Sequence, residues 1–236
     1  MNLLLQRRVE GLIVFSNPFY LDIGREFERV PDKRKVPTVL IGRESEIENL
    51  SSVVVNNEAG GRMAIEHLYT LGHRRIAFVK GPEVFLDSRQ RWKGISTFAS
   101  EAGLEVRDEL VVELTKPNAS YEEGYQLTQT LLTRKHSFTA LVAWDDRTAY
   151  GAIRALKAAG LEVPHDCSVT GFDDTSEAAF YNPPLTTVRQ PMETLGTLSV
   201  GILAEAIQAF LEKRMSSKVQ QVVAPELIVR ESTARV

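Results

Sequence analysis

"ALVAWDDRTAYGAIRALKAAGLEVPHDCSVTGFDD", residues 140–174, is the stretch that decides the fold. Two short apolar runs, 139–144 and 167–172, predict buried strands. Between them, residues 146–160 carry apolar side chains at helical spacing and end in a glycine, which is typical of an amphipathic helix and its stop. Each strand is followed at once by two aspartates. A strand, a helix and a second strand in this order predict a parallel pair joined by a crossover helix.

The same alternation continues along the rest of the 236-residue chain. Further apolar runs predict buried strands at 9–15, 37–42, 52–56, 75–81 and 110–114. Helical patterns occupy 57–72, 120–132 and 192–214. In the second of these, Ser120 and Glu123 have the spacing of a capping box. Strands that alternate with helices predict an α/β protein, with doubly wound parallel sheets covered by helices on both faces.

Polar side chains follow several of the predicted strands where each strand ends. Ligands of such sheets bind beyond the carboxyl ends of the strands. We therefore expect these side chains to converge on one crevice and the carboxylates to face a ligand. The residues concerned are Ser16 and Asn17, then Asp87, Ser88 and Arg91 in a loop, and the pairs Asp145-Asp146 and Asp173-Asp174.

Composition limits the classes of protein that fit. The chain has 28 Lys and Arg against 31 Asp and Glu, a net charge of -3, which is not the electrostatic footprint of a nucleic-acid-binding domain. The single cysteine, Cys167, allows no internal disulfide and is expected to be a small core residue. No apolar run approaches the ~20 residues of a membrane span, and the first residues do not form a secretory signal. A cytoplasmic protein without membrane contact is therefore expected.

Several chemical motifs are missing from the sequence. It contains no G-x-G-x-x-G, P-loop, H-E-x-x-H or G-x-S-x-G pattern, and its four histidines lack ligand spacing. We expect neither a cofactor nor a metal, and no enzymatic activity. The acid pairs leave two interpretations open. They can serve magnesium and phosphoryl chemistry, or Asp146 and Asp174 lie in the first turn of a helix, which leaves Asp145 and Asp173 free to accept hydrogen bonds from a ligand.

Several segments together carry a resemblance to a known family. The 140–174 stretch is joined by "GHRRIAFVKGP" (72–82), "SRQRWKG" (88–94), "NPPLTTVRQP" (182–191), "VEGLIVF" (9–15), "VPTVLIGR" (36–43) and "APELIVREST" (224–233). In this order and spacing they resemble the effector-binding core of the lactose-repressor and galactose-repressor (LacI/GalR) family of bacterial transcription regulators. The resemblance runs from about residue 5 to the C-terminus.

The resemblance implies a type I periplasmic-binding-protein-like fold, in which two α/β lobes are joined by three crossings. On this sequence the crossings fall near Val55-Asn56, Val188–Gln190 and Ala224-Pro225. The implied N-terminal lobe is 1–54 plus 190–223, and the C-terminal lobe is 57–187 plus 226–236. The family's helix-turn-helix headpiece and hinge helix have no counterpart here, nor do the first strand, helix and strand of the N-terminal lobe. We therefore expect an incomplete first lobe.

The resemblance also implies a set of ligand-binding residues. By position these are Phe15, Val55, Arg91, Asp145, Asp173 and Gln190. For Arg91 the alternative is a surface ion pair on an amphipathic helix, and for the two aspartates it is helix capping. Two positions depart from the family: Asp often stands where Gly42 is, and an aromatic residue is often near Ala119. The ligand then differs from a typical hexose, or Tyr121 or Trp144 supplies the stacking group.

These features predict the ligand-sensing module of a transcriptional repressor. Carboxylates that accept from hydroxyls and an arginine that donates suit a sugar or polyol, with a purine as a further candidate. The expected partners are a small-molecule effector, a second copy of the chain in a homodimer, and operator DNA only through a headpiece. A periplasmic sugar-binding protein for uptake shares the fold, and an enzyme that uses the acid pairs is the third hypothesis.

Overall fold

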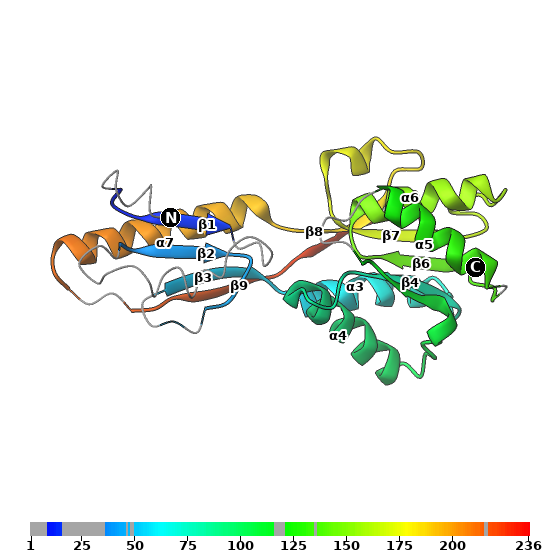
Figure 1. Cartoon of the computed structure of the whole chain (residues 1–236), viewed down its shortest axis with the longest axis horizontal. Coiled ribbons are helices and arrows are strands. Elements are labelled where there is room, and N and C mark those ends of the chain that lie inside the picture. Colours follow the sequence, from blue (N-terminus) through cyan, green and yellow to red (C-terminus); the bar gives the residue numbers. More distant parts are fainter. Residues whose placement is uncertain are drawn as a thin grey trace. The chain divides into compact units, whose positions relative to one another are not determined.

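The chain divides into two compact units, which are described separately below (Figure 1). Unit 1 is Met1–Asn56 with Pro191–Ala224, and unit 2 is Asn57–Gln190 with Pro225–Val236. Gln190 therefore closes unit 2, whereas the sequence interpretation placed it in the first lobe. This computed structural model describes residues 9–15, 36–45, 47, 50–115, 121–134, 136–214 and 217–236.

In the part of unit 1 that the structure describes, a helix packs on a parallel sheet. The strand order is β1 (Leu12–Phe15), β2 (Thr38–Ile41), β3 (Leu50–Val55) and β9 (Gln220–Val223). Helix α7 (Met192–Leu211) contacts β1, β2 and β3. Its Leu195 is buried against side chains of the two central strands, Val39, Ile41, Val53 and Val55. The predicted apolar stripe of this helix is therefore the face that meets the sheet.

The length and composition of α7 differ from one sequence expectation. The helix has 20 residues and a mean hydropathy of 1.5, so by length and composition alone it is apolar enough to cross a membrane. In the sequence no uninterrupted apolar run reaches that length, because Glu193 and Glu205 lie within the helix. Since one face of α7 packs on the sheet of unit 1, its apolar residues have a structural use that needs no membrane.

Unit 2 is built on a six-stranded sheet. Its strand order is β10 (Glu226–Ile228), β8 (Thr186–Arg189), β7 (Ser168–Asp173), β6 (Ala140–Ala143), β4 (Ile76–Lys80) and β5 (Val111–Glu113). All neighbours are parallel except β10, which runs antiparallel to β8. The helices are α3 (Asn57–Thr70), α4 (Leu86–Glu101), α5 (Tyr121–Thr133) and α6 (Asp146–Ala158), with 3-10 turns η2 (Asp108–Leu110) and η3 (Ser176–Ala179).

Helices cover both faces of this sheet, as the sequence predicted. Figure 1 shows α5 and α6 on one face and α3 and α4 on the other. Each face has its own buried cluster, one around Leu141, Ile153 and Val169 and the other around Ile65 and Phe78. Parallel strands that are buried on both faces are apolar along their whole length, which is why they appear in the sequence as continuous apolar runs.

Both helix pairs of unit 2 are in contact through their backbones. A Cβ built on Gly61 of α3 lies 2.1 Å from the Arg91 carbonyl oxygen, and one on Gly94 of α4 lies 1.9 Å from that of Glu58. On the other face, Gly124 of α5 and Gly151 of α6 approach the carbonyl oxygens of Thr148 and Tyr121 in the same reciprocal way. Only glycine fits at such approaches. These four glycines fix how closely each helix pair packs.

Some predicted elements differ from those observed. The segment after β4 was expected to be a loop, but from Leu86 it is helix α4. Strands β9 and β10 were not predicted as strands, because their exposed polar residues hide the pattern. Ser120 of the predicted capping box lies outside the described residues. Cys167 is buried as expected, and burial raises the pKa of its thiol.

The last residues of the chain form part of unit 2. His73 is buried and contacts Ser168 Oγ and the Ala234 carbonyl oxygen, each at 3.0 Å. Ser232 Oγ donates to the Val169 carbonyl oxygen and accepts from the Thr186 backbone N–H. These bonds extend the hydrogen bonding of β7 and β8, so the C-terminal segment is a structural part of unit 2.

Candidate functional site

The tip of β7 has an unusual backbone conformation. Asp173 and Asp174 have φ values of 113° and 55°, in the left-handed region that residues other than glycine seldom adopt. Two consecutive residues of this kind store strain, and such strain clusters at ligand sites, where the surrounding structure holds it in place. The carboxyl end of β7 is therefore the first candidate for a functional site.

Asp173 is held by the residue that follows β8. Gln190 Nε2 donates to Asp173 Oδ1 at 2.6 Å, and the Gln190 backbone N–H donates to the Asp173 carbonyl oxygen at 3.4 Å. Arg91 Nη2 lies 3.9 Å from the same Oδ1. The other carboxylate oxygen, Oδ2, is not engaged by these groups, and 33% of the side-chain surface is exposed. Asp173 therefore has one oxygen fixed and one available to a ligand.

The electrostatic environment of Asp173 opposes its negative charge. Desolvation by the surrounding protein is the largest influence and, together with the nearby Asp145 and Asp146, raises the pKa to about 7. Arg91 and the Gln190 amide act in the opposite direction. The side chain remains a third exposed, so the carboxylate is desolvated by its neighbours without being sealed from a ligand. At neutral pH its charge is only partly formed, and a ligand that donates hydrogen bonds stabilises the charged form.

Arg91, on α4, connects three parts of unit 2. Its Nε donates to Asn57 Oδ1 at 2.9 Å, and Nη1 donates to the Trp144 carbonyl oxygen at 2.7 Å. The guanidinium carbon lies 3.5 Å from the centre of the Phe172 ring, and the residue is buried. The alternative of a surface ion pair is therefore wrong. Much of the donor capacity is used inside the protein, which leaves Nη2 as the donor nearest to Asp173.

Asp145 caps helix α6. Its Oδ1 accepts from the Thr148 backbone N–H at 2.8 Å, and it is the N-cap residue with extended backbone dihedrals. Burial raises its pKa, while Thr148 and the charges of Arg91 and Arg147 lower it. The sequence left helix capping and ligand contact open for Asp145, and the structure shows capping for Oδ1. Its second oxygen is the candidate for ligand contact.

Asp146 lies in the first turn of α6, as predicted, but it also has a structural role in unit 2. It is fully buried, its Oδ1 accepts from Thr187 Oγ1 at 2.5 Å, and its Oδ2 accepts from the Thr175 backbone N–H at 2.7 Å. Burial raises its pKa to about 6, against the hydrogen bonds from Thr187 and Thr175, which lower it. Asp146 thus joins α6 to β8 and to the segment after β7. No sequence pattern marked either threonine.

Asp174 was expected in the first turn of a helix, and this expectation is wrong. Its Oδ2 accepts from Arg189 Nε at 2.6 Å, and its Oδ1 lies 2.6 Å from Arg230 Nη2. The turn that follows, η3, begins only at Ser176. The two aspartates of the pair therefore have different environments, since Asp173 points toward the ligand-site residues and Asp174 into an ion-paired cluster.

Trp144 lies beside the site and is packed within unit 2. Its ring stacks on Phe85 with centroids 6.0 Å apart and planes 5° apart, and it covers Gly81 closely. Its buried Nε1–H finds no hydrogen-bond acceptor in the described part of the chain. A small cavity of about 30 Å³ adjoins Trp144, Arg91 and Ser88. Trp144 therefore stacks on Phe85, the residue before α4, and also lies near Arg91 at the carboxyl end of β6.

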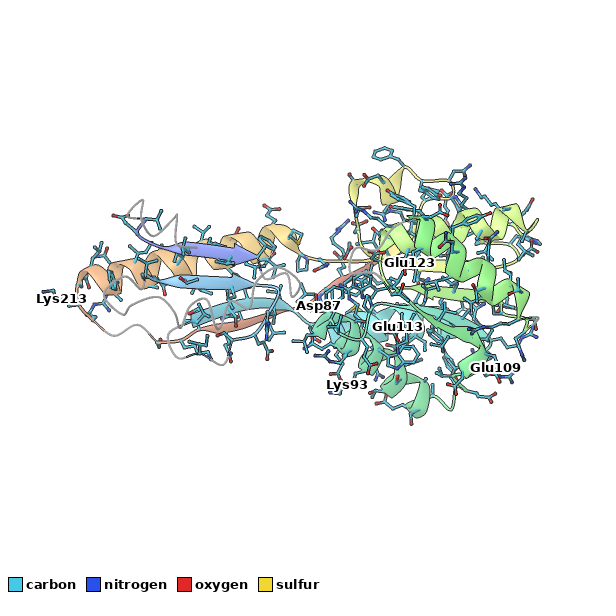
Figure 2. All side chains as sticks on the ribbon, viewed as in Figure 1. Asp87, Lys93, Glu109, Glu113, Glu123 and Lys213 are labelled. Atoms are coloured by element: carbon cyan, nitrogen blue, oxygen red, sulfur yellow. The ribbon has the colours of Figure 1, made fainter. Side chains whose placement is uncertain are left out.

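The other residues that the sequence marked as candidates do not all lie at the carboxyl ends of β6 and β7. Figure 2 shows Asp87 at the carboxyl end of the unit 2 sheet and Glu109 at the opposite end. Asp87 is near enough to Arg91 to feel its charge, although burial raises the pKa of its carboxyl group. Tyr121 stacks on Tyr150, with centroids 5.8 Å apart and 49% of its surface exposed. Ser16, Asn17 and Ala119 lie outside the described residues.

Phe15 and Val55 belong to unit 1. Phe15 ends β1 and is 60% exposed, whereas Val55 ends β3 and is buried with Val53 and Leu195. Their contact with a ligand stays a prediction, as does that of Arg91, Asp145, Asp173 and Gln190. Within unit 2 the structure does bring the last four together. Gly42 has a positive φ of 89°, so an aspartate there meets backbone strain.

The chemistry available at this end of unit 2 is that of binding. It offers carboxylate acceptors from Asp145 and Asp173, an amide from Gln190 and a guanidinium from Arg91. None of these is paired with a nucleophile and base in catalytic geometry. Over the residues that the structure describes, no group of three His, Cys, Asp or Glu side chains is placed to hold a metal ion. Acceptors and donors of this kind recognise hydroxyl groups.

The fold and this cluster define a ligand-binding α/β module of the periplasmic-binding-protein-like class. A model of the periplasmic binding protein-like domain matches residues 65–233, more than half of the chain. Among curated proteins, the chain is 37% identical over 233 residues to an HTH-type transcriptional regulator in aml 5′ region from Streptomyces limosus, and 34% identical to the HTH-type repressor PurR of Serratia proteamaculans. These matches cover 98% of the chain and 64% and 65% of the two relatives.

Solved structures extend the comparison. The transcriptional regulator CelR in complex with cellobiose is 30% identical, with a TM-score of 0.84, and the match covers 98% of this chain and 68% of that one. A LacI family regulator from Enterococcus faecium with bound ribose is 28% identical, with a TM-score of 0.81 and coverage of 99% and 83%. Both carry a sugar.

This chain belongs to the periplasmic-binding-protein-like family and, within it, corresponds to the effector-binding region of LacI-type transcriptional regulators. The family resemblance found in the sequence is thereby confirmed, as is the α/β fold. The relatives are regulators, so the comparisons favour a sensing module over an uptake protein. They are also not enzymes.

Proposed function

We propose that this chain is the sensor of a sugar or polyol effector, and that it binds a ligand without transforming it. The observation that supports this most is the cluster at the carboxyl ends of β6 and β7. There Asp145 and Asp173 each use Oδ1 in a hydrogen bond within the protein, and Arg91 Nη2 lies 3.9 Å from Asp173 Oδ1. The relatives whose titles name cellobiose and ribose support the same chemistry. A purine is the second candidate, because PurR proteins are among the relatives.

The arrangement favours ligands with adjacent hydroxyl groups. A hydroxyl donates to Asp173 Oδ2 while its neighbour donates to Asp145, and a ring or hydroxyl oxygen accepts from Arg91. Each bond to a charged group contributes about 1.5–3 kcal/mol when water is excluded. In the full-length regulator this binding acts on operator DNA. We further propose that the protein is cytoplasmic and works as a homodimer, in line with the nature of its relatives.

A thermal-shift screen tests the function. Cellobiose, maltose, ribose, myo-inositol, hypoxanthine and guanine are each added to the wild-type chain. A ligand at 100 times its Kd stabilises the folded state by about 2.7 kcal/mol, which is a clear rise in Tm. We expect a sugar or polyol to raise the Tm, and the rise to be much smaller in Asp173→Asn.

The matched control is Asp108→Asn, an exposed aspartate in η2 before β5. It should keep the full response to the ligand. A panel in which no compound raises the Tm argues against the function. A ligand that binds Asp173→Asn as tightly as wild type places the site elsewhere.

Homodimer formation is tested by sedimentation over a range of protein concentrations. We expect a concentration-dependent dimer. A chain that stays monomeric at the highest concentrations contradicts this part of the proposal and leaves the ligand site unaffected.

A further inference from the structure

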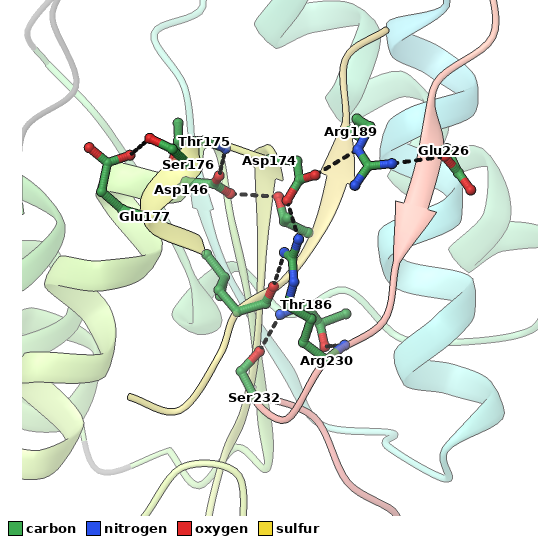
Figure 3. Close-up of polar contacts among 12 residues, drawn as sticks. Asp146, Asp174, Thr175, Ser176, Glu177, Thr186, Arg189, Glu226, Arg230 and Ser232 are labelled. Atoms are coloured by element: carbon green, nitrogen blue, oxygen red, sulfur yellow. Dashed lines mark hydrogen bonds and ion pairs between the residues drawn. The ribbon is translucent and has the colours of Figure 1, made fainter. Parts of the chain in front are cut away.

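Four charged residues form a continuous chain of ion pairs next to Asp173 and Gln190 (Figure 3). Asp174 binds Arg189 through Oδ2 and Arg230 through Oδ1, both at 2.6 Å, and Arg189 Nη1 also lies 3.4 Å from Glu226. We call Asp174, Arg189, Glu226 and Arg230 the crossing clamp. It contains two acids and two arginines, so its charges balance. Removal of one member leaves a charge without its counterpart.

The crossing clamp joins the ends of three neighbouring strands. Asp174 follows β7, Arg189 ends β8, Glu226 begins β10, and Arg230 lies two residues after β10. Arg230 is held further, since Nη1 donates to the Leu185 carbonyl oxygen at 2.8 Å and its backbone N–H donates to Thr186 Oγ1. The side chains of Asp174 and Arg230 are only 7% and 16% exposed. These contacts are stronger than those of a solvent-exposed surface pair, because water screens them little.

The crossing clamp flanks the bond that orients Asp173. Asp174 and Arg189 are the chain neighbours of Asp173 and Gln190, and those two residues bond each other through Gln190 Nε2 and Asp173 Oδ1. In the sheet, Asp173 is also the register partner of Arg189. Clamp residues therefore adjoin both ends of the Asp173–Gln190 bond, and at one end the backbone of Asp173 and Asp174 has left-handed φ values.

Two clamp residues also lie where the chain passes between the units. Gln190, next to Arg189, is the last residue of one segment of unit 2, and Pro225, next to Glu226, is the first residue of another. The Arg189–Glu226 pair thus links the unit 2 ends of two connecting segments. Asp174 connects this pair to the site strand. The crossing clamp therefore connects the strand that carries Asp173 to both connecting segments.

We propose that the crossing clamp is a positioning device of the effector site, which orients the Asp173 carboxylate and ties it to the two segments that leave unit 2. The inference rests on the proposed function for its ligand. The contacts of the crossing clamp themselves involve only residues of unit 2. Asp174 is a positioning residue, because it acts through Asp173 and Gln190. The clamp then determines whether a ligand at Asp173 affects the connecting segments.

Hydrogen exchange of the ligand-free protein tests the geometry. In Asp174→Asn we expect faster exchange at 187–190 and 226–228, with little change in α5. The control is Leu104→Ala, which removes a buried side chain after α4 from the opposite end of the sheet. Its effect should not be concentrated in the connecting segments. Equal exchange patterns in the two variants would overturn the positioning role.

A double-mutant cycle tests the coupling to the ligand, with cellobiose and ribose as the probes. Asp174→Asn should weaken binding about tenfold in the wild-type background. In the Asp173→Asn background it should have no effect, because the oriented carboxylate is already gone. An equal loss in both backgrounds identifies a general structural effect and contradicts the inference. A wild-type chain that binds neither probe counts against the proposed function, while the exchange experiment still decides the clamp.

Two further variants cover the case in which Asp174→Asn fails to fold. Glu226→Gln removes only the exposed member of the clamp and should increase exchange at 226–228 and 187–190 while the fold remains. Asp174→Glu keeps the charge and should restore ligand affinity to within a few-fold of wild type. Failure of Glu226→Gln to change exchange at the connecting segments contradicts the proposal.

Discussion

Asp173 shows how the backbone conformation and the electrostatics of one residue combine at the candidate ligand site. Its φ of 113° turns the chain at the strand end, and its carboxylate accepts from Gln190 and lies near Arg91. Asparagine tolerates left-handed dihedrals and retains a carbonyl oxygen for the Gln190 amide. Asp173→Asn therefore isolates the charge from the geometry.

The pH dependence of stability should report this charge. The folded-state pKa of Asp173 is about 7, above the ~3.9 of an unfolded aspartate, so between these values the folded protein binds a proton that the unfolded chain does not. This group therefore favours folding in mild acid and loses that effect as the pH rises through 7. The free energy of unfolding of wild type relative to Asp173→Asn should decrease from about pH 4 to about pH 8 and be constant above that. Urea titrations measure it, and a constant difference speaks against the raised pKa.

Arg91 should not tolerate replacement by lysine. The planar guanidinium donates to Asn57 Oδ1 and the Trp144 carbonyl oxygen from two different nitrogens, which a single ammonium group cannot reproduce. A buried acceptor left unpaired costs about 1–3 kcal/mol, and we expect Arg91→Lys to lose that amount of unfolding free energy. Arg89→Lys, on an exposed position of the same helix, is the control. Equal urea midpoints for the two variants would show that the bonds of Arg91 matter little.

Residue identities in the site were more predictable than residue roles. The doubled aspartates marked the carboxyl ends of two strands, and the family resemblance singled out Asp145 and Asp173, whose contact with a ligand stays a prediction. Adjacent aspartates look alike in a sequence, however, and the N-cap is decided by which one keeps an extended backbone. Asp145 has that conformation. The partners of Asp174, Arg189 and Arg230, lie far along the chain and leave no local pattern.

At the scale of elements, replacing a helix glycine by alanine should change stability in opposite directions at two positions. A Cβ on Gly94 lies 1.9 Å from the Glu58 carbonyl oxygen, whereas one on Gly196 of α7 has no neighbour within 4 Å. Gly94→Ala should destabilise by about 1–3 kcal/mol through overpacking. Gly196→Ala should stabilise by up to about 1 kcal/mol, because alanine has the higher helix propensity. Urea unfolding measures both, and a neutral Gly94→Ala contradicts the close approach.

The elements missed from the sequence have a shared cause. Helix α4 begins without a side-chain cap, in a polar stretch that also carries Asp87 and Arg91, so its start has no local signal. Strands β9 and β10 are short and largely exposed. They are strands because the sheet next to them offers unpaired backbone groups, which is a tertiary effect. The buried parallel strands were predicted because their burial requires continuous apolar sequence.

At the scale of the whole molecule, the two units differ in their cores. Among the described residues, unit 1 buries two small apolar clusters and unit 2 two large ones. Since burial of apolar surface drives folding, unit 1 should unfold at a lower urea concentration. Both tryptophans, Trp92 and Trp144, lie in unit 2. The loss of circular dichroism should therefore begin before the change in tryptophan fluorescence.

The control for this experiment is Leu104→Ala, which should shift the fluorescence transition and leave the first part of the circular dichroism change in place. Coincident transitions for both probes in the wild type argue that the units unfold together. In that case the interactions along the connecting segments outweigh the difference between the two cores.

The four close-contact glycines limit which substitutions this protein can accept during evolution. Gly61, Gly94, Gly124 and Gly151 each face a backbone carbonyl on the partner helix, and every other amino acid brings a Cβ. Any missense change in these codons therefore separates a helix pair, and with it the positions of Arg91 on α4 and of the α6 N-terminus beside Asp145. Homologues that bind a different effector can differ in the side chains at the carboxyl ends of the strands. In the same homologues, the four positions should still be glycine.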